Sequence, residues 1–495
     1  MWTSINQALN IIDNFVWGVP LMVLIIAGGL LLTIRLGLLQ IRKLPLALKW
    51  MLQNEEGGKG EISSFSALCT ALSATIGTGN IVGVATAVCA GGPGALFWMV
   101  VAAFLGMATK YSEGLLAVKY RTVAEDGHSL GGPFYYIELG MGKNFKWLAK
   151  IFAFFGVCVG LFGIGTFSQV NGISSAVHGF FDPNDAFTVK ILPFLGEYSW
   201  SVVIASLILS FCVAAVLIGG VKRIASVSQI IVPFMAVIYF VFAVILICCN
   251  ITKVPAAFAT IVTAAFSPKA ITGGAVGSML IAMQKGVARG IFSNEAGLGS
   301  APIAAAAAQT NSPVRQGLVS MTGTFIDTII ICTLTGISIV LTGAWQVEGL
   351  EGVQVTTYAF QHGLPFPAQF SSFILMLCLV FFAFTTILGW DYYSERCLEY
   401  LSGGNMKHVK IFRWIYILAV FIGPYMTVSA VWTIADIFNG LMAIPNMIAL
   451  FALSGVIVKE TRAFFQHAKE EARAEHRSFE EVCEENLNEE EAPAN

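Results

Sequence analysis

One polar stretch inside a long apolar run contains the groups that would bind a small charged ligand. It is Gly77-Thr78-Gly79-Asn80, within a charge-free run at 62–109 that is long enough to cross a bilayer. Glycine costs a helix interior about 1 kcal/mol relative to alanine, and non-helical backbone at membrane depth occurs only where protein buries it or a cavity adjoins it. We therefore expect a broken helix. Its freed amides and the positive end of the following half-helix would bind a carboxylate, and freed carbonyls with Asn80 would bind a cation.

A second interruption lies in the apolar run at 272–292. Gln284, Lys285 and Gly286 stand there, where a continuous apolar helix has no reason to contain them. We expect a second broken helix at this point, with Gln284 as the residue that contacts a substrate. Two interrupted helices at corresponding positions of a membrane protein locate one binding site.

The fourth apolar run contains three further candidates. Phe167, Gln169 and Asn171 fall within a stretch at 151–180 that has no formal charge. Gln169 and Asn171 are two residues apart and do not share a helix face, so at most one or two of the three residues line a pocket. We predict that Gln169 binds the ammonium or carboxylate group of a substrate and that Phe167 forms an apolar wall. Hydrogen bonding between helices is the alternative role.

Acidic residues inside apolar runs are costly and indicate function. Asp327 has no other charge between residues 316 and 346. We expect it to act in coupling or gating, with pairing to Arg289 or a position near the membrane interface as alternatives. Asp436 is a weaker example of the same kind.

Other polar residues have ordinary structural interpretations. Adjacent hydroxyl residues such as Thr385 and Thr386, in the ninth run, often bond back to the helix carbonyl four residues earlier. Trp390, at the end of the same run, is expected to be an interfacial anchor. Glu113 and Lys110 are three residues apart near the end of the third run, and they are expected to form a local ion pair.

Composition indicates an all-α polytopic membrane protein. The chain is 56% hydrophobic and 12% charged over 495 residues, with a mean hydropathy of +0.75, whereas soluble domains are about 25% charged. A membrane-spanning helix needs about 20 apolar residues. Eleven such runs occur, at roughly 15–38, 65–90, 93–118, 148–178, 199–219, 226–250, 272–292, 315–342, 366–391, 410–428 and 432–458.

The distribution of charge predicts the orientation of these spans. Lysine and arginine concentrate in alternate loops, which marks those loops as cytoplasmic, whereas the loops at 181–198 and 343–365 are mainly acidic. With eleven spans, the N-terminus is then external and the C-terminus cytoplasmic. Residues 1–459 form the membrane domain, and residues 460–495 form a charged cytoplasmic tail that begins as a surface helix and continues as a disordered segment.

The spans also predict an internal repeat. Spans two to six enter from the cytoplasm and spans seven to eleven enter from outside, so the two sets of five have opposite topology. This is the arrangement of an inverted repeat. The expected division is an additional N-terminal helix with a cytoplasmic loop at 1–62, a first repeat at 63–250 and an inverted second repeat at 251–459.

Four strings resemble the alanine or glycine:cation symporters, an amino acid carrier family of sodium-coupled transporters from bacteria and archaea. They are GTGNIVGVATA (77–87), GGPGALFWM (91–99), GVARGIFSNEAGLGSAP (286–302) and FIDTIIICT (325–333), and the similarity extends from about Ser63 to about Pro445. The resemblance implies a LeuT-type five-plus-five inverted repeat with one extra helix, in agreement with the topology obtained from the loops. It also implies a location in the plasma (inner) membrane of a prokaryote.

The resemblance gives the first break a more specific role. Gly77-Thr78-Gly79-Asn80 is similar to the Gly-x-Gly-Asn break of the sodium:neurotransmitter symporters, whose asparagine contacts sodium, and this implies a sodium ligand at Asn80. An N-cap of the second half-helix or a simple packing kink is the alternative. Thr78 and Gly79 would offer backbone amides to a substrate carboxylate.

A sodium site is also implied by the resemblance to LeuT-type symporters. The matching helix of those proteins supplies two adjacent hydroxyl residues to a sodium ion, which correspond here to Thr385 and Thr386. The carbonyls of Ser73 and Ile76 would complete the site. Ligands that are all oxygen atoms suit a hard cation.

The expected function is import of a small neutral amino acid, of the alanine or glycine class, by symport with sodium through alternating access. A proton-coupled carrier of the same fold, a channel, and a sensor that binds without transport are the alternatives. The six histidines are scattered without ligand spacing and no phosphate-binding loop occurs, so we expect neither an enzyme nor an ATP-driven pump. The expected partners are the amino acid, sodium and the lipid bilayer, with no organic cofactor, nucleic acid or obligate protein partner.

Overall fold

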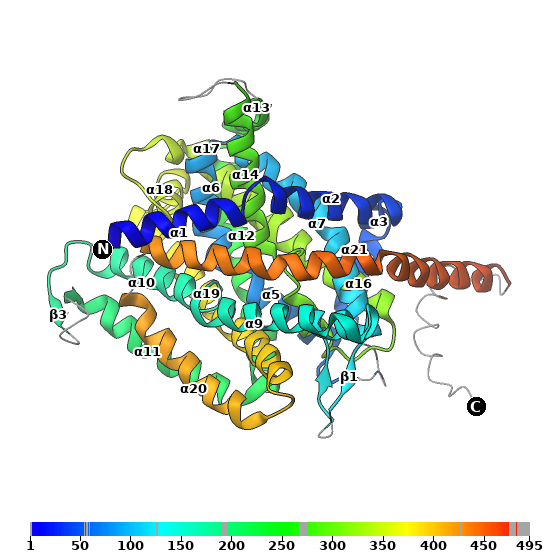
Figure 1. Cartoon of the computed structure of the whole chain (residues 1–495). Helices are drawn as coiled ribbons and strands as arrows, with labels where there is room; N and C mark the ends of the chain where they lie inside the picture. Colours follow the sequence, from blue (N-terminus) through cyan, green and yellow to red (C-terminus); the bar gives the residue numbers. More distant parts are fainter. Residues whose placement is uncertain are drawn as a thin grey trace.

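The structure, a computed structural model, describes residues 2–53, 55, 58, 60–124, 127–190, 197–266, 275–425, 428–474 and 482. These residues form a helical bundle in which α1 (Trp2–Val16) and α21 (Val428–Ala474) lie side by side along one face (Figure 1). The strands described form two small antiparallel hairpins, β1 (Thr122–Val123) with β2 (Ser129–Leu130), and β3 (Thr188–Lys190) with β4 (Glu197–Ser199). The chain is almost entirely helical in the part described, as its composition predicts.

The remaining elements follow in chain order. Those of the first half are α2 (Val19–Arg35), α3 (Leu39–Arg42), α4 (Leu44–Leu52), α5 (Ser64–Thr75), η1 (Gly79–Gly83), α6 (Val84–Gly91), α7 (Gly94–Lys119), α8 (Pro133–Tyr135), η2 (Tyr136–Gly140), η3 (Lys143–Phe145), α9 (Lys146–Phe162), α10 (Phe167–Phe181), α11 (Trp200–Leu217), α12 (Gly220–Cys249), η4 (Ile251–Lys253) and α13 (Val254–Phe266). Those of the second half are α14 (Ala275–Asn294), α15 (Ala301–Ala305), α16 (Pro313–Thr324), η5 (Phe325–Cys332), α17 (Thr333–Thr342), η6 (Ala344–Gln346), α18 (Val353–Gly363), α19 (Ala368–Leu401), α20 (Met406–Ile422) and η7 (Gly423–Tyr425).

Seven segments of the described chain are long and apolar enough to cross a membrane. They are Gly94–Lys119, Lys143–Phe181, Trp200–Leu217, Gly220–Cys249, Pro313–Thr342, Ala368–Leu401 and Thr433–Ala474. The pair Ser64–Thr75 and Gly79–Gly91 meets the same test with a bend of 50°, and the apolar helices Val19–Arg35 and Ile251–Phe266 are shorter. The chain is therefore a mostly helical, multi-pass membrane protein.

The helices differ from the expected runs in particular places. Residues 272–274, 426 and 427 of the expected spans lie outside the described residues, as does most of the tail. α13 and α18 form in segments that were expected to be loops. α21 continues without a break from the last expected span to residue 474, so the tail begins as a continuation of that helix.

The first predicted break is present at 76–78. α5 ends at Thr75, and Ile76 has extended backbone angles (φ −78°, ψ 92°) before the chain resumes as the π-helical turn η1. The Asn80 side chain accepts a hydrogen bond from the Gly77 N–H at 2.9 Å. It thus satisfies one of the donors that the interruption frees, but Asn80 is not an N-cap, because Thr78 has that position and the bond runs back to an earlier residue.

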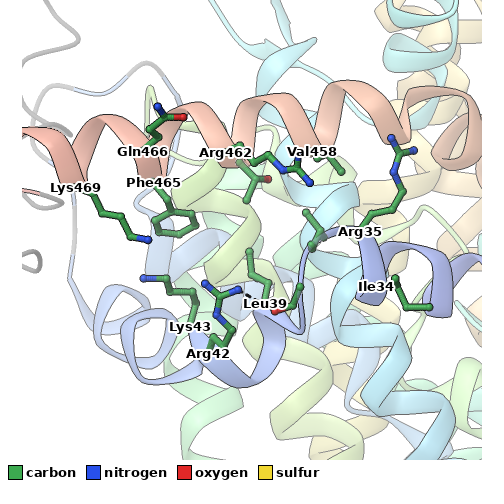
Figure 2. Close-up of a pocket in the computed structure, with 13 residues that line it drawn as sticks. Ile34, Arg35, Leu39, Arg42, Lys43, Val458, Arg462, Phe465, Gln466 and Lys469 are labelled. Atoms are coloured by element: carbon green, nitrogen blue, oxygen red, sulfur yellow. Dashed lines mark hydrogen bonds between the residues drawn. The ribbon is translucent and has the colours of Figure 1, made fainter.

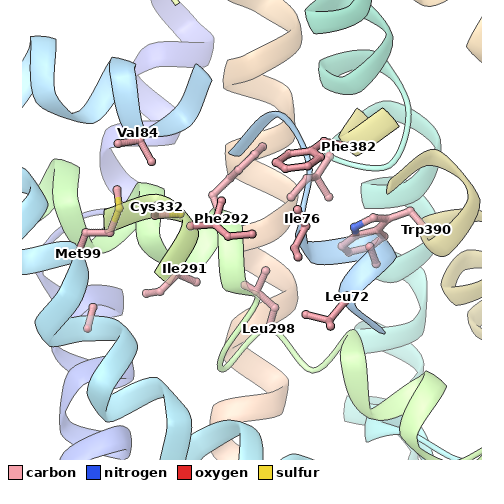
Figure 3. Packing of buried hydrophobic residues seen from close by; sticks show 14 of the residues in the cluster. Leu72, Ile76, Val84, Met99, Ile291, Phe292, Leu298, Cys332, Phe382 and Trp390 are labelled. Carbon is pink, nitrogen blue, oxygen red and sulfur yellow. The ribbon is translucent and has the colours of Figure 1, made fainter. Parts of the chain in front are cut away.

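A close approach of α5 and α19 fixes the position of this break. An added Cβ at Gly389 would lie 2.8 Å from the backbone nitrogen of Ala74, so the two backbones are nearly in contact. Around this contact, Leu72, Ile76 and Phe382 pack in one apolar cluster (Figure 3). Small residues at such contacts allow helix backbones to approach in membranes.

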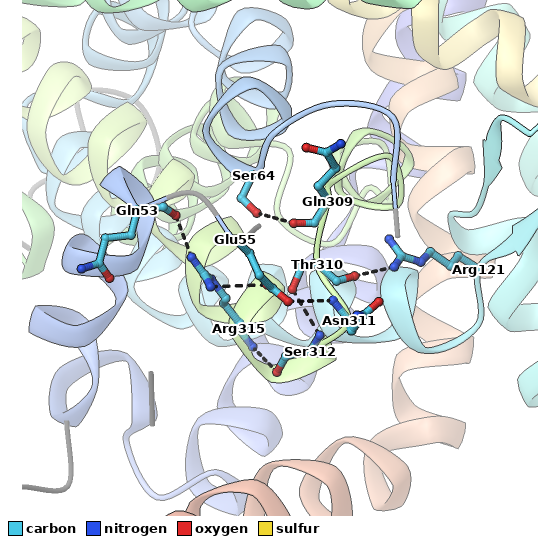
Figure 4. A network of polar contacts seen from close by, with 9 residues as sticks. All are labelled: Gln53, Glu55, Ser64, Arg121, Gln309, Thr310, Asn311, Ser312 and Arg315. Atoms are coloured by element: carbon cyan, nitrogen blue, oxygen red, sulfur yellow. Dashed lines mark hydrogen bonds and ion pairs between the residues drawn. The ribbon is translucent and has the colours of Figure 1, made fainter. Parts of the chain in front are cut away.

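A polar network joins the segments at one end of the bundle (Figure 4). Arg315, in the first turn of α16, donates Nη2 to the carbonyl oxygen of Gln53 at 2.7 Å and lies 3.4 Å from the carboxylate of Glu55. Arg121 donates Nη1 to the carbonyl oxygen of Ala308 at 2.8 Å. The two arginines therefore hold the chain before α5 and the chain after α15 in a fixed arrangement.

An ion pair ties α14 to α21. The guanidinium of Arg289 contacts the carboxylate of Asp436 through two hydrogen bonds, at 2.9 and 2.7 Å. The Arg289 partner is thus Asp436 and not Asp327, which corrects one of the alternatives given for Asp327. The two side chains are only 16% and 13% exposed, so the pair is largely desolvated.

This pair gives a prediction about stability. Arg289→Met should destabilise the folded protein by about 3 kcal/mol, because it leaves the Asp436 carboxylate partly buried without its partner. Arg289→Met combined with Asp436→Leu should recover most of that loss. Thermal unfolding of the purified variants in detergent measures both effects, and equal destabilisation by the single and double substitutions would contradict the coupling.

Candidate functional site

The first break lies against α10 through Gln169. The Thr78 N–H donates to Gln169 Oε1 at 3.0 Å, and Gln169 Nε2 donates to the carbonyl oxygen of Ile164 at 2.9 Å. The second bond orients the amide so that its oxygen faces the break. Gly172, three residues further on, presents the same helix face to Thr78, whose Cγ2 an added Cβ would meet at 2.5 Å. Helical periodicity therefore places Gln169 and Gly172, but not Asn171, toward the break.

The other two candidates of this helix have no described hydrogen bond to the break. The Phe167 ring packs on Phe162, with ring centroids 6.0 Å apart, and it contacts Gly423 beyond α20. Asn171 is buried. Among the described hydrogen bonds at the break, neither Phe167 nor Asn171 takes part.

The hydroxyl pair on α19 reaches the break through one of its members. Thr386 Oγ1 lies 3.3 Å from the carbonyl oxygen of Ile76 and 3.0 Å from that of Phe382. Thr385 Oγ1 bonds back to the Phe381 carbonyl at 3.1 Å and lies against Met235 of α12 at 3.6 Å. Both hydroxyls donate to the Phe382 carbonyl at 3.0 Å, but of the two only Thr386 also lies near the carbonyl oxygen of Ile76.

Two further residues of the break have defined surroundings. The Ser73 hydroxyl bonds back to the Thr70 carbonyl at 2.7 Å, so it does not cross to another helix. An added Cβ at Gly79 would lie 3.1 Å from Cα of Ser293 and 3.4 Å from the Phe292 ring. Gly79 therefore faces the end of α14 at close range.

The prediction of a break at Gln284, Lys285 and Gly286 is wrong, and we call the irregular chain between α14 and the short helix α15 the second break. α14 is continuous through residues 284–286 and ends at Asn294, and the chain at 295–300 is irregular before α15. Glu295, Gly297 and Gly299 there have positive φ values of 59°, 90° and 81°. Positive φ is rare for a residue other than glycine, and such backbone persists only where the surrounding structure imposes it.

The residues predicted to form the second break have other roles. Gln284 Nε2 donates to the carbonyl oxygen of Trp17 at 3.1 Å, away from the first break. An added Cβ at Gly286 would collide with the carbonyl oxygen of Ala95. Gly286 thus permits α14 to lie close to α7, and its low helix propensity does not interrupt the helix because the packing compensates for it.

Asp327 connects the two breaks. Its carboxylate accepts hydrogen bonds from Asn80 Nδ2 at 2.7 Å, from Ser293 Oγ at 2.9 Å and from Thr328 Oγ1 at 2.6 Å. Asn80 belongs to the first break, and Ser293 belongs to the last turn of α14 before the second. A fully buried carboxylate with three donors is a stable arrangement for an ionised group in an apolar interior.

The second break is held by two more carboxylates. Glu295 accepts from Trp390 Nε1 at 2.8 Å and from Ser300 Oγ at 2.6 Å. Glu113 accepts from the Gly297 N–H at 3.1 Å. Trp390 is fully buried, so the expectation of an interfacial anchor is wrong.

Lys110 is the cation of this buried region. Its Nζ donates to the carbonyl oxygen of Asn294 at 2.7 Å, at the end of α14. Among the described ion pairs, none joins it to Glu113, which corrects the expected local pair. Glu113 is instead bonded to Asn446 Nδ2 at 2.6 Å, on α21. The ammonium therefore satisfies an orphan carbonyl at a helix C-terminus, where positive charge is favoured.

Several residues of this arrangement were missed by the analysis of the sequence. The signal for the second break was the pair Gly297-x-Gly299 in the string at 286–302, which repeats the spacing of Gly77-x-Gly79. Nothing in the sequence singled out Ser293 and Thr328, because hydroxyl residues are common in membrane helices. Their partner Asp327 could be recognised only as an isolated acid.

The fold and this interior define the class of protein. Helices broken near buried polar and charged groups, within a multi-pass bundle, are typical of a membrane transporter. Comparison with known proteins agrees: the model of the sodium:alanine symporter family matches residues 2–478. The chain belongs to that family, and it is a transporter rather than an enzyme.

Individual relatives are similar over almost their whole length. An uncharacterized transporter of Haemophilus influenzae is 55% identical over 467 residues, which cover 94% of this chain and 97% of that protein. The sodium/alanine symporter AgcS of Methanococcus maripaludis is 46% identical, with 94% and 98% covered. The probable sodium/glutamine symporter GlnT of Bacillus subtilis is 36% identical, with 95% and 92% covered.

A solved structure shares the fold. The crystal structure of MhsT in complex with L-phenylalanine matches 82% of this chain and 99% of that chain, with a TM-score of 0.51 and 12% sequence identity. At this identity the likeness concerns the fold alone, which is LeuT-like.

The crowding at Gly77 gives a prediction for this site. An added Cβ there would lie 2.5 Å from Thr386 Oγ1 and 2.9 Å from Gln169 Oε1. Gly77→Ala should displace both side chains and weaken binding of the amino acid substrate at least about tenfold, which corresponds to about 1.4 kcal/mol. The ligand-induced thermal shift of the purified protein measures this loss.

Gly83→Ala is the matched control. The same methyl group at Gly83, in η1, would meet its nearest neighbour at 4.0 Å, so this variant should keep the wild-type shift. A wild-type shift in Gly77→Ala as well would show that ligand binding does not depend on the Thr386 and Gln169 contacts at the break.

Proposed function

We propose that the protein imports a small neutral amino acid, of the alanine or glycine class, by symport with sodium. The observation that carries this proposal is the hydrogen-bonded connection from the first break through Asn80 and Asp327 to the end of α14. A substrate or ion bound beside one break then alters contacts of the other. The 46% identity to the sodium/alanine symporter AgcS supports the choice of ion and substrate class.

The substrate carboxylate is proposed to bind at the backbone of Thr78 and Gly79. In the structure, Gln169 Oε1 accepts the Thr78 N–H at 3.0 Å. An oxygen acceptor therefore already occupies the position that a carboxylate oxygen would take. Binding exchanges one acceptor for another, and Gln169 Nε2 can then donate to the substrate. Substrate contacts of Phe167, Asn171 and Gln284 are proposed with less support, because no described hydrogen bond joins these side chains to the break.

Sodium is proposed to bind between α5 and α19. The Ile76 carbonyl and the Thr386 hydroxyl, 3.3 Å apart, are two oxygen atoms from different helices. The carbonyl of Ser73, one turn earlier on α5, and the hydroxyl of Thr385 are the further ligands proposed for this site. Carbonyl and hydroxyl oxygens are suitable ligands for a hard cation.

Asp327 supplies negative charge near the first break. Its carboxylate is bonded to Asn80, whose Oδ1 accepts from Gly77 and retains a second lone pair. The pair is proposed to hold a cationic group, either a sodium ion or the ammonium of the substrate. Both alternatives place positive charge beside a carboxylate that an apolar interior would otherwise disfavour.

The proposed transport cycle is alternating access about this site. A LeuT-type inverted repeat formed by spans two to six and seven to eleven, after one extra helix, places two broken helices at its centre. We propose eleven spans with an external N-terminus and a cytoplasmic tail. Rocking of one group of helices against the other would open the site to each side in turn.

The ion gradient that drives uptake distinguishes sodium symport from its alternatives. Proteoliposomes of the purified protein should accumulate labelled alanine or glycine when a sodium gradient is imposed, and not when a proton gradient alone is imposed. Accumulation with the proton gradient alone would identify a proton-coupled carrier. Flux that neither saturates nor requires a gradient of either ion would identify a channel.

The proposed sodium site predicts a difference between two neighbouring threonines. Thr386→Val removes a hydroxyl that faces Ile76 and should raise the sodium concentration for half-maximal uptake about tenfold, the effect of about 1.4 kcal/mol. Thr385→Val removes the same group from the adjacent residue and should have a smaller effect. Uptake as a function of sodium concentration, at saturating substrate, makes the comparison. Unchanged sodium dependence in Thr386→Val would place the ion elsewhere.

A further inference from the structure

A cavity of about 500 Å³ lies between the N-terminal helices and α21, far along the chain from the residues of the two breaks. We call it the basic pocket and define it by six of its lining residues, Arg35, Arg42, Lys43, Arg462, Phe465 and Lys469. Figure 2 shows side chains from α2 and α3 on one wall and from α21 on the other. The cavity is thus formed where segments more than 400 residues apart in the sequence meet.

The charged side chains described around the basic pocket are all positive. Five of the described lining side chains are cationic, and no acidic residue is among the lining residues that the structure describes. Two acids of α21 that stand near these lining residues in the sequence have partners: Glu460 pairs with Lys119 at 2.8 Å, and Glu470 accepts from Gln466 at 2.9 Å. Five like charges around one cavity repel one another, so an anion inside the cavity would lower their energy.

The cations are held in place by their surroundings. Arg35 Nη1 donates to Ser454 Oγ at 2.6 Å, and Arg42 Nη1 donates to the Gly37 carbonyl at 3.1 Å. Lys43 Nζ lies 4.5 Å from the centre of the Phe465 ring. A guanidinium has five N–H donors, so each arginine retains donors for an anion after its internal bond is made.

The position of the basic pocket indicates the source of the anion. Arg35 is the last residue of the apolar helix α2, and Arg462 follows the apolar part of α21. Charged residues at such positions lie at the level of the lipid headgroups. Ile34, which also lines the cavity, is 67% exposed, and Ile41 is 57% exposed. Apolar surface beside a cluster of cations suits a molecule that has both a phosphate and acyl chains.

We propose that the basic pocket binds the phosphate group of an anionic glycerophospholipid, with an acyl chain along Ile34. Basic pockets between membrane helices on the cytoplasmic side are known sites for anionic lipid headgroups. The lipid would bridge α2–α3 and α21 by neutralising cations on both walls. Its effect is to stabilise the docking of the N-terminal helices on the bundle, at a site separate from the proposed transport site.

The experiment compares lipids and a charge-matched pair of variants. Purified full-length protein in detergent is given phosphatidylglycerol, phosphatidylcholine or inorganic phosphate, and thermal unfolding is measured. Arg462→Gln with Lys469→Gln removes two exposed cations of the basic pocket, and Lys407→Gln with Lys410→Gln removes two exposed cations from α20. Both double variants change the net charge equally, and native mass spectrometry counts the lipid molecules retained by each.

Phosphatidylglycerol should raise the unfolding temperature of the wild type more than phosphatidylcholine does, because it binds the folded state. The pocket variant should lose this difference and retain fewer phosphatidylglycerol molecules, whereas the α20 variant should keep both. Equal responses of the two variants, or no specific response in the wild type, would overturn the proposal. A wild-type shift reproduced by inorganic phosphate at millimolar concentration would assign the pocket to a free anion instead of a lipid.

Discussion

The hydrogen bond between Asn80 and Asp327 is the interaction on which the centre of the structure depends. The Asn80 amide is used at both ends, because its oxygen accepts from Gly77 and its nitrogen donates to the carboxylate at 2.7 Å. The carboxylate also accepts from Ser293, at the end of α14. A buried polar group that loses its partner costs about 1–3 kcal/mol. A change of conformation at either break would therefore leave a donor or an acceptor of these hydrogen bonds without a partner. A bound ligand that supplies the missing partner would remove this cost.

Close contacts at glycines determine how near the polar groups lie to one another. An added Cβ at Gly389 would lie 2.8 Å from the Ala74 nitrogen, and one at Gly172 would lie 2.5 Å from Cγ2 of Thr78. The first contact brings α19 against α5, and the second brings α10 against the break. In a bilayer there is little hydrophobic force between helices, so close packing of this kind supplies much of their association. The distances within the site are thus a consequence of where residues without a side chain occur on neighbouring helices.

The sequence predicted the family, the helical membrane fold and the position of the first break. Glycines and an asparagine in a charge-free run are conspicuous, and the choice of Gln169 agrees with its hydrogen bond to Thr78. The second break was misplaced because polar residues near Gln284 were taken as the interruption, whereas α14 is straight there and ends at Asn294. Contacts between residues distant in sequence could not be predicted from the sequence either. Nothing local shows that Arg289 pairs with Asp436, or that Trp390 is buried against Glu295.

The side chain of Gln169 is suited to the substrate site that we propose at the first break, where the ligand would carry both charges. A glutamate at this position would satisfy the Thr78 amide equally well, but it would repel an incoming carboxylate in an interior where charges are poorly screened. A glutamine offers an acceptor and two donors on one terminal group. Its oxygen bonds to Thr78 in the structure at 3.0 Å, and a rotation of the amide would present the donors instead. The free energy of exchanging one hydrogen bond for another is small, about 1 kcal/mol. Selectivity among amino acids would then depend on how closely α5, α10 and α19 pack around the bound molecule, and not on the strength of any one polar contact.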